Sequence, residues 1–124
     1  LYTKGGTTGL AAVVDTDKEF AIWVHIALLK TNVAKAEPYW LEAMLNSEFC
    51  YAQSQRYTHG IANRDLGLKR MVKIEMYLPS KAAQRQFVKA TSVLRRMMSQ
   101  FEQVSTLSLD VFSSLRTRAF SGQL

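Results

Sequence analysis

Residues 80–120 read SKAAQRQFVKATSVLRRMMSQFEQVSTLSLDVFSSLRTRAF, and this stretch decides the architecture of the chain. Its apolar residues recur at spacings of three and four, which is typical of one face of a helix. Counted in sevens, one column holds Phe87, Leu94, Phe101, Ser108 and Leu115, and the column four residues later holds Thr91, Met98, Ser105, Phe112 and Ala119. We interpret the two columns as the a/d pattern of a coiled-coil seam. The large residues of this seam are Phe87, Leu94, Met98, Phe101, Phe112 and Leu115.

A single helix over residues 80–120 would extend about 60 Å, because each residue adds roughly 1.5 Å. The rest of so small a chain cannot cover that length, and we expect the apolar edge to pair with another helix. The alternative is a core helix of one compact domain. Ser105 and Ser108 bring hydroxyls into the seam, which favours either a bend there or a seam shifted onto Val104 and Leu107.

Composition indicates one small globular chain with a basic second half. The 124 residues are 48% apolar and 21% charged, which is ordinary globular composition. Residues 1–63 hold five Lys/Arg and six Asp/Glu, whereas residues 64–124 hold eleven and four; the balances of −1 and +7 sum to the net charge of +6. Such a surface favours a polyanion, most often nucleic acid, although a solvated helix face explains the charge as well.

The start of the chain and its cysteine bear on location. The chain opens on Leu1 rather than Met, and we interpret it as a fragment whose own start is missing. No apolar run approaches the length of a membrane span, so we expect a cytoplasmic protein that contacts no membrane. The single cysteine, Cys50, lies in an amphipathic helical pattern, which indicates a small buried side chain in a reducing compartment.

The first 79 residues mix strand and helix patterns. Residues 10–14 are apolar and residues 20–29 alternate in size, which predicts two strands. Pro38 suits the first turn of one amphipathic helix that continues to about Gln55 and packs on the sheet.

A short helical turn is expected at residues 66–70, and the alternation in residues 73–78 predicts a third strand that stops at Pro79. Ser80 suits the N-cap of the long helix. The predicted fold class is therefore α+β or α/β, with a mixed sheet and a packed helix in residues 1–79 and a long coiled-coil helix in residues 80–124.

The sequence offers no catalytic or metal-binding constellation. His25 and His59 have no cysteine or carboxylate at metal-ligand spacing, and a lone histidine is usually structural. The acidic residues are scattered, and Asp15 and Asp17 suit a turn. We expect no catalytic residue, no metal and no cofactor.

Several motifs occur in an order that is typical of one family. They are a glycine-centred loop, LGLKRM at residues 66–71, IEMYLP at residues 74–79, Gln84 four residues into a helix, and RAFSGQL at residues 118–124. The order resembles the DNA specificity subunit of type I restriction-modification systems, from the second half of a target recognition domain through the conserved helix that follows it. The resemblance covers nearly all of the chain, although Glu75 and Tyr77 stand where the family commonly has prolines.

The resemblance implies a non-catalytic reader of double-stranded DNA. In that family an α/β recognition domain reads half of a split site, and long helices pair antiparallel as a spacer. The methyltransferase (modification) subunits dock around these helices, and the restriction subunit is a separate chain too. By this reading, residues 1–79 are the C-terminal part of a recognition domain and residues 80–124 the conserved helix.

Side-chain chemistry alone nominates the DNA contacts, because the contact positions of the family vary with the target. Residues 56–64 form a polar, basic loop with an aromatic residue and a glycine. Arginine can read guanine edges and tyrosine can stack or bond to phosphate, whereas many loop side chains are merely solvated. The candidates are Lys4, Arg56, Tyr57, His59 and Arg64 for the loops, with Lys69 and Arg70 as phosphate neighbours.

Two other functions stay open. The first is a coiled-coil assembly module that holds partner subunits and binds no DNA itself. The second is an unrelated small enzyme, which the missing catalytic constellation disfavours. Because the chain is predicted to contain no second helix long enough to cover the seam, we expect the fragment to self-associate through its long helix.

Overall fold

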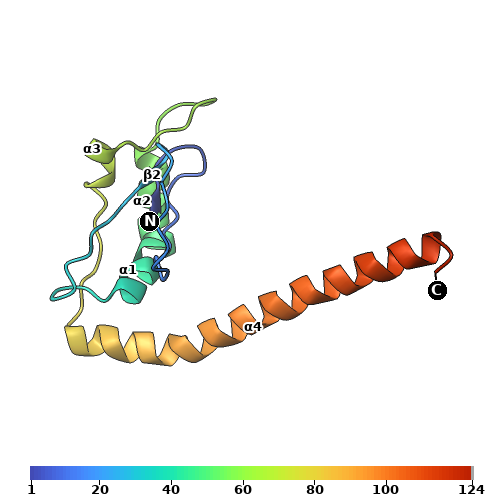
Figure 1. Cartoon of the computed structure of the whole chain (residues 1–124). Coiled ribbons are helices and arrows are strands. Elements are labelled where there is room, and N and C mark those ends of the chain that lie inside the picture. The colour runs from blue at the N-terminus through green and yellow to red at the C-terminus, as the bar shows by residue number, and fades with distance from the viewer. Residues whose placement is uncertain (124) are drawn as a thin grey trace. The chain divides into compact units, whose positions relative to one another are not determined.

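The computed structural model describes residues 1–123, and Figure 1 shows its elements. In chain order they are β1 (Tyr2–Thr3), β2 (Ile26–Ala27), α1 (Pro38–Leu45), α2 (Glu48–Tyr57), α3 (Leu68–Met71) and α4 (Lys81–Phe120). The chain divides into two compact units, Leu1–Val88 and Lys89–Leu124. Helices thus combine with one small sheet and a long C-terminal helix, which agrees with the α+β prediction at a coarse level.

The predicted long helix is confirmed, and α4 continues without interruption through the serines at 105 and 108. Ser80 caps it as predicted: its hydroxyl accepts from the Ala83 N–H at 3.3 Å. At the other end, the Gln123 N–H donates to the Arg118 carbonyl at 2.9 Å and Gly122 adopts φ +70°. This is a Schellman cap, which needs a left-handed residue and therefore favours glycine.

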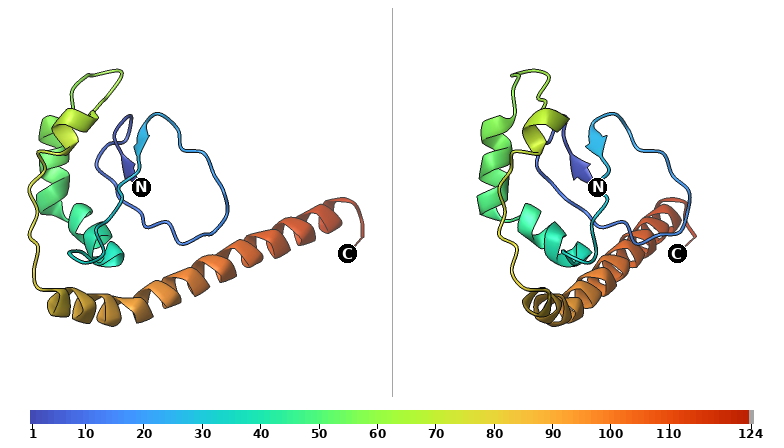
Figure 2. Two further views of the ribbon diagram at one scale, coloured as in Figure 1. Left: turned by 60° about the vertical axis from the view of Figure 1, so that its left-hand side comes forward. Right: turned by 90° about the vertical axis from the view of Figure 1, so that its left-hand side faces the viewer.

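The three predicted strands are largely wrong. In residues 10–14 only Ala11 pairs, through one bridge to Tyr2, and in residues 20–29 only β2 pairs, with β1. Residues 73–78 form no strand. A strand needs a ladder partner along its whole length, and β1 offers only two residues. The segment before β2 is therefore a long irregular loop (Figure 2), and Trp23 on it is 71% exposed.

The predicted single helix from Pro38 to Gln55 is two helices, although Pro38 does begin the first. Asn46 and Ser47 interrupt the helix because their side chains bind backbone groups, and these bonds compete with continuation of the helix. The Ser47 hydroxyl accepts from the Cys50 N–H at 3.4 Å and caps α2. The Asn46 amide accepts from the Ala11 N–H at 2.8 Å and donates to the Ala11 carbonyl at 2.9 Å.

Gln53 on α2 makes the same kind of two-bond contact with residue 75. Its Oε1 accepts from the Glu75 N–H and its Nε2 donates to the Glu75 carbonyl, both at 2.9 Å. An amide side chain thus takes the place of a neighbouring strand, and the irregular segment after α3 runs beside α2 (Figure 2). This explains why an alternating sequence is held extended without entering a sheet.

The core of the first unit is small. Its buried cluster consists of Tyr2, Leu45, Cys50, Leu66 and Ile74. Cys50 is completely buried, as predicted, and its Sγ lies 3.6 Å from the Glu75 carbonyl. Burial raises the pKa of the Cys50 thiol and of the Tyr2 phenol above their ordinary values.

Gln84, in the first turns of α4, is also completely buried. Its Nε2 donates to the carbonyls of Lys35 at 3.1 Å and Pro79 at 2.8 Å, and its Oε1 accepts from the Glu37 N–H at 2.8 Å. Glu37 precedes α1 and also pairs with Lys81 at 2.6 Å. One amide therefore joins the starts of α1 and α4.

We predict that Gln84→Met destabilises the first unit. Methionine has a similar length but removes the three part-buried hydrogen bonds to the Glu37 N–H and to two carbonyls, and each such bond contributes about 0.5–1.5 kcal/mol. The free energy of unfolding should fall by about 2–4 kcal/mol in a urea titration that follows tryptophan fluorescence, since Trp40 on α1 is buried. Gln86→Met, at an exposed position on the same helix, is the matched control. Equal stabilities of the two variants would show that the hydrogen bonds of the Gln84 amide do not stabilise the first unit.

Candidate nucleic-acid interface

Four segments of the first unit meet around the predicted contact loop. His59 and Asp65 exchange two backbone hydrogen bonds, at 2.9 and 2.8 Å, and close the loop. The Leu66 N–H donates to the Lys4 carbonyl at 2.8 Å, and the Lys4 N–H donates to the His25 carbonyl at 2.8 Å. Backbone hydrogen bonds thus bring together His25, Lys4, the residues around 65 and His59.

Gly60 is required by the shape of this loop. It adopts φ +92°, and a Cβ there would lie 2.2 Å from the Asn63 carbonyl oxygen. Any other residue would force the backbone apart. Glycine is therefore the residue that fits where the loop turns back toward the pair of hydrogen bonds that closes it.

Two of the predicted loop residues belong to α2 instead. Arg56 and Tyr57 lie in the last turn of that helix. Arg56 is exposed, whereas Tyr57 is partly buried and packs against the core cluster. Tyr57 thus has a packing role, and its contact with DNA stays a prediction. His59 is exposed, and Lys4 is half-buried.

Arg64 and Arg70 both bind within the protein. Arg64 donates to the Gln55 side-chain oxygen, while the Gln55 Nε2 donates to the Thr8 carbonyl at 2.9 Å. Arg70 donates to the Asp65 carboxylate and to the Asp65 carbonyl, both at 2.9 Å. Sequence spacing gave no sign of either contact, because both partners are set by the way the loop folds.

The surroundings remain strongly basic. Residues 56–73 contain five Lys/Arg and one acidic residue, Asp65. Arg56, Lys69 and Lys73 are exposed. Exposed cations that few carboxylates offset attract a polyanion at long range.

The tip of the loop carries a side chain that the sequence analysis did not single out. Ile61 is 102% exposed, more than any other large apolar side chain among residues 1–123. The sequence does carry a sign of this exposure: Ile61 is an aliphatic residue directly after a loop glycine, and it belongs to no helical or strand period. Asn63 is also exposed at this tip.

A second candidate surface lies on α4 in the second unit. Leu94, Met98, Phe101, Phe112 and Leu115 are all exposed, with Phe101 at 70% and Phe112 at 64%. The predicted seam is thus uncovered by the residues that the structure describes. Toward the C-terminal end of α4, Val104, Leu107, Ser108, Val111, Phe112 and Leu115 form one open, largely apolar face. Phe87, in the first unit, is exposed too.

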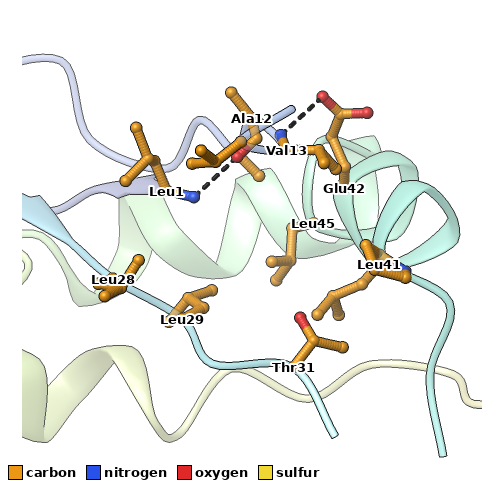
Figure 3. A pocket seen from close by; sticks show the side chains of 12 residues that line it. Leu1, Ala12, Val13, Leu28, Leu29, Thr31, Leu41, Glu42 and Leu45 are labelled. Carbon is orange, nitrogen blue, oxygen red and sulfur yellow. Dashed lines mark hydrogen bonds between the residues drawn. The ribbon is translucent and has the colours of Figure 1, made fainter. Parts of the chain in front are cut away.

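A small apolar pocket in the first unit offers no comparable chemistry. Leu28, Leu29, Leu41 and Leu45 line it, and its volume is about 210 Å³ (Figure 3). At its rim the Leu1 ammonium donates to the Ala12 carbonyl at 2.7 Å. Ligand cavities are commonly about 300–1,000 Å³, so this pocket is small for a cofactor.

Within residues 1–123, no group of three or more His, Cys, Asp or Glu side chains is placed to hold a metal ion. In the same part of the chain, no helix has both the length and the apolar character of a membrane span. Comparison with known protein families, with characterised proteins and with solved structures gave no match.

We predict that Arg70 orders the loop without adding much to global stability. Arg70→Ala removes two hydrogen bonds to Asp65, so the amides of His59 and Asp65 should exchange hydrogen several-fold faster. Because the pair is partly exposed and screened, the free energy of unfolding should change by less than about 1 kcal/mol. Lys69→Ala, on the exposed neighbouring side chain, is the control. Identical exchange in both variants would show that the loop orders itself without Arg70.

Proposed function

We propose that this chain is a non-catalytic, sequence-specific DNA recognition unit of a type I restriction-modification complex. The observation that carries the proposal is the basic loop region of residues 56–73, which the backbone hydrogen bonds between His59 and Asp65 close and in which Arg56, Lys69 and Lys73 are among the exposed cations. Exposed cations supply attraction to phosphate, and a fixed loop supplies a surface for reading bases. In this proposal α4 is the element through which the chain joins methyltransferase and restriction subunits.

The rival proposal is an assembly module that binds no DNA. It is favoured by the internal contacts of Arg64 and Arg70, which reduce the number of nominated readers with a free guanidinium. It is also favoured by the long exposed apolar face of α4. A gel shift with a random duplex at low salt distinguishes the two, since only a recognition unit should retard it.

We predict that Lys69 and Lys73 contribute phosphate attraction rather than sequence reading. In the double variant Lys69→Ala/Lys73→Ala, affinity for any duplex should fall, and the slope of log affinity against log salt should flatten by about 1.8 if both contacts are lost. Arg56→Ala should instead cost about 1–3 kcal/mol on the preferred duplex and little on random DNA.

The control for the lysine pair is Lys18→Ala/Lys30→Ala, which removes the same charge at two exposed positions outside residues 56–73. Binding titrations at several salt concentrations give both quantities. If the two double variants behave alike, residues 56–73 are not the phosphate-binding surface. If Arg56→Ala lowers both affinities equally, Arg56 is an electrostatic anchor.

We also predict self-association through α4. A stripe of exposed Leu, Met and Phe this long is larger than a monomer normally leaves in water. Light scattering over a dilution series should show a dimer that Phe101→Asp dissociates. Truncating a buried Phe costs about 3–5 kcal/mol, so even Phe101→Ala should weaken the dimer about a hundredfold or more.

Gln103→Asp adds the same charge on the polar side of α4 and should leave the dimer intact. A protein that stays monomeric at high micromolar concentration, with or without Phe101→Asp, would rule out pairing of this helix with itself.

A further inference from the structure

We propose that Ile61 reads DNA by packing against the 5-methyl group of a thymine in the major groove. This inference rests on the proposed recognition function and adds a base contact to it. It starts from the complete exposure of Ile61 at the tip of the loop that His59 and Asp65 close.

The fold holds Ile61 out in solvent. The two bonds between His59 and Asp65 close the loop directly below it, and Gly60 turns the chain so sharply that a Cβ would collide with the Asn63 carbonyl. The Gly6 N–H donates to the Arg64 carbonyl at 2.9 Å and holds the part of the loop that runs back toward Asp65. Ile61 therefore cannot reach the core cluster unless these contacts break, which suits a side chain that packs against something outside the chain.

The charges around the tip identify the kind of surface it meets. Arg56 at the end of α2, Lys69 on α3 and Lys73 two residues after α3 are exposed. Asp65, already paired with Arg70, is the one carboxylate of residues 56–73. A segment that carries exposed cations and an exposed apolar side chain suits a polyanion that has apolar groups between its phosphates. In duplex DNA the major groove admits a two-stranded ribbon, and the apolar group on its floor is the thymine methyl.

Asn63 adds a second feature of the same chemistry. It lies two residues after Ile61 on the same tip, it is exposed, and its side chain makes no hydrogen bond with residues 1–123. Asparagine pairs in a bidentate way with the N6 and N7 of adenine. An aliphatic side chain and an asparagine together therefore match a T·A pair. Arg64, the next residue, donates to the Gln55 side-chain oxygen.

The test compares thymine with uracil. The whole chain is used at low salt to enrich bound sequences from a randomised duplex library, and the enriched duplex is then made with deoxyuridine in place of thymidine. This change removes the methyl and leaves base pairing and the minor groove as they were. The wild-type chain should lose about fourfold in affinity, the factor expected for one buried methyl-sized group.

Ile61→Ala should bind the thymine duplex about as weakly as the wild type binds the uracil duplex, and uracil should cost it nothing more. Because Ile61 is fully exposed, the variant should unfold at the same urea concentration as the wild type. The control is Val72→Ala, which trims another exposed apolar side chain beside α3 and should keep the full sensitivity to uracil.

Each other outcome overturns the inference in a distinct way. If the chain binds the enriched duplex equally with thymine and uracil, the recognition function stands and the methyl contact does not exist. If no duplex is retarded at low salt, the recognition function fails and the contact fails with it. If Ile61→Ala leaves DNA binding unchanged but weakens self-association, Ile61 is a protein contact.

Discussion

Hydrogen bonds from side-chain amides to the backbone hold this protein's segments in place where no strand pairs with them. Among residues 1–123, the ladder between β1 and β2 holds two residues on each strand, so most of the backbone outside the helices has no strand partner. Asn46 and Gln53 each bind both backbone groups of one residue, and Gln84 binds three backbone groups at the start of α4. A side-chain amide can do this because it carries the same donor and acceptor as a peptide group.

This arrangement has consequences for the candidate interface. A ladder between strands would fix whole segments, whereas one amide fixes one residue and leaves the chain on either side irregular. The loop of residues 59–65 is accordingly held at discrete points: by its closing bonds, by Gly6, and by the side chains of Gln55 and Arg70. The shape of the loop depends on a few polar contacts. The small hydrophobic core holds Leu66, the residue that follows the loop.

The sequence predicted those features that depend on local patterns. The helical period, the Ser80 cap and the Pro38 start are properties of neighbouring residues, and all three are confirmed. The strands were wrong because alternation states only that a segment can pair, while pairing needs a partner elsewhere in the chain. The break at Asn46 was missed for the same reason, since its partner Ala11 lies 35 residues away. For the interface, the sequence identified the basic loop but not which cations are held.

That last distinction bears on how the surface can recognise a ligand. An arginine already held by protein groups, as Arg64 is by Gln55, loses little further freedom when a ligand arrives, but its donors are partly used. An exposed lysine such as Lys69 keeps its donors and its freedom, so under the proposed function it would attract phosphate without selecting a base. In the proposed complex with DNA, selectivity would then come from side chains whose backbone is held in place. In residues 56–73 these are the ones at the loop tip, beside Gly60, where the closing hydrogen bonds set the direction of the chain.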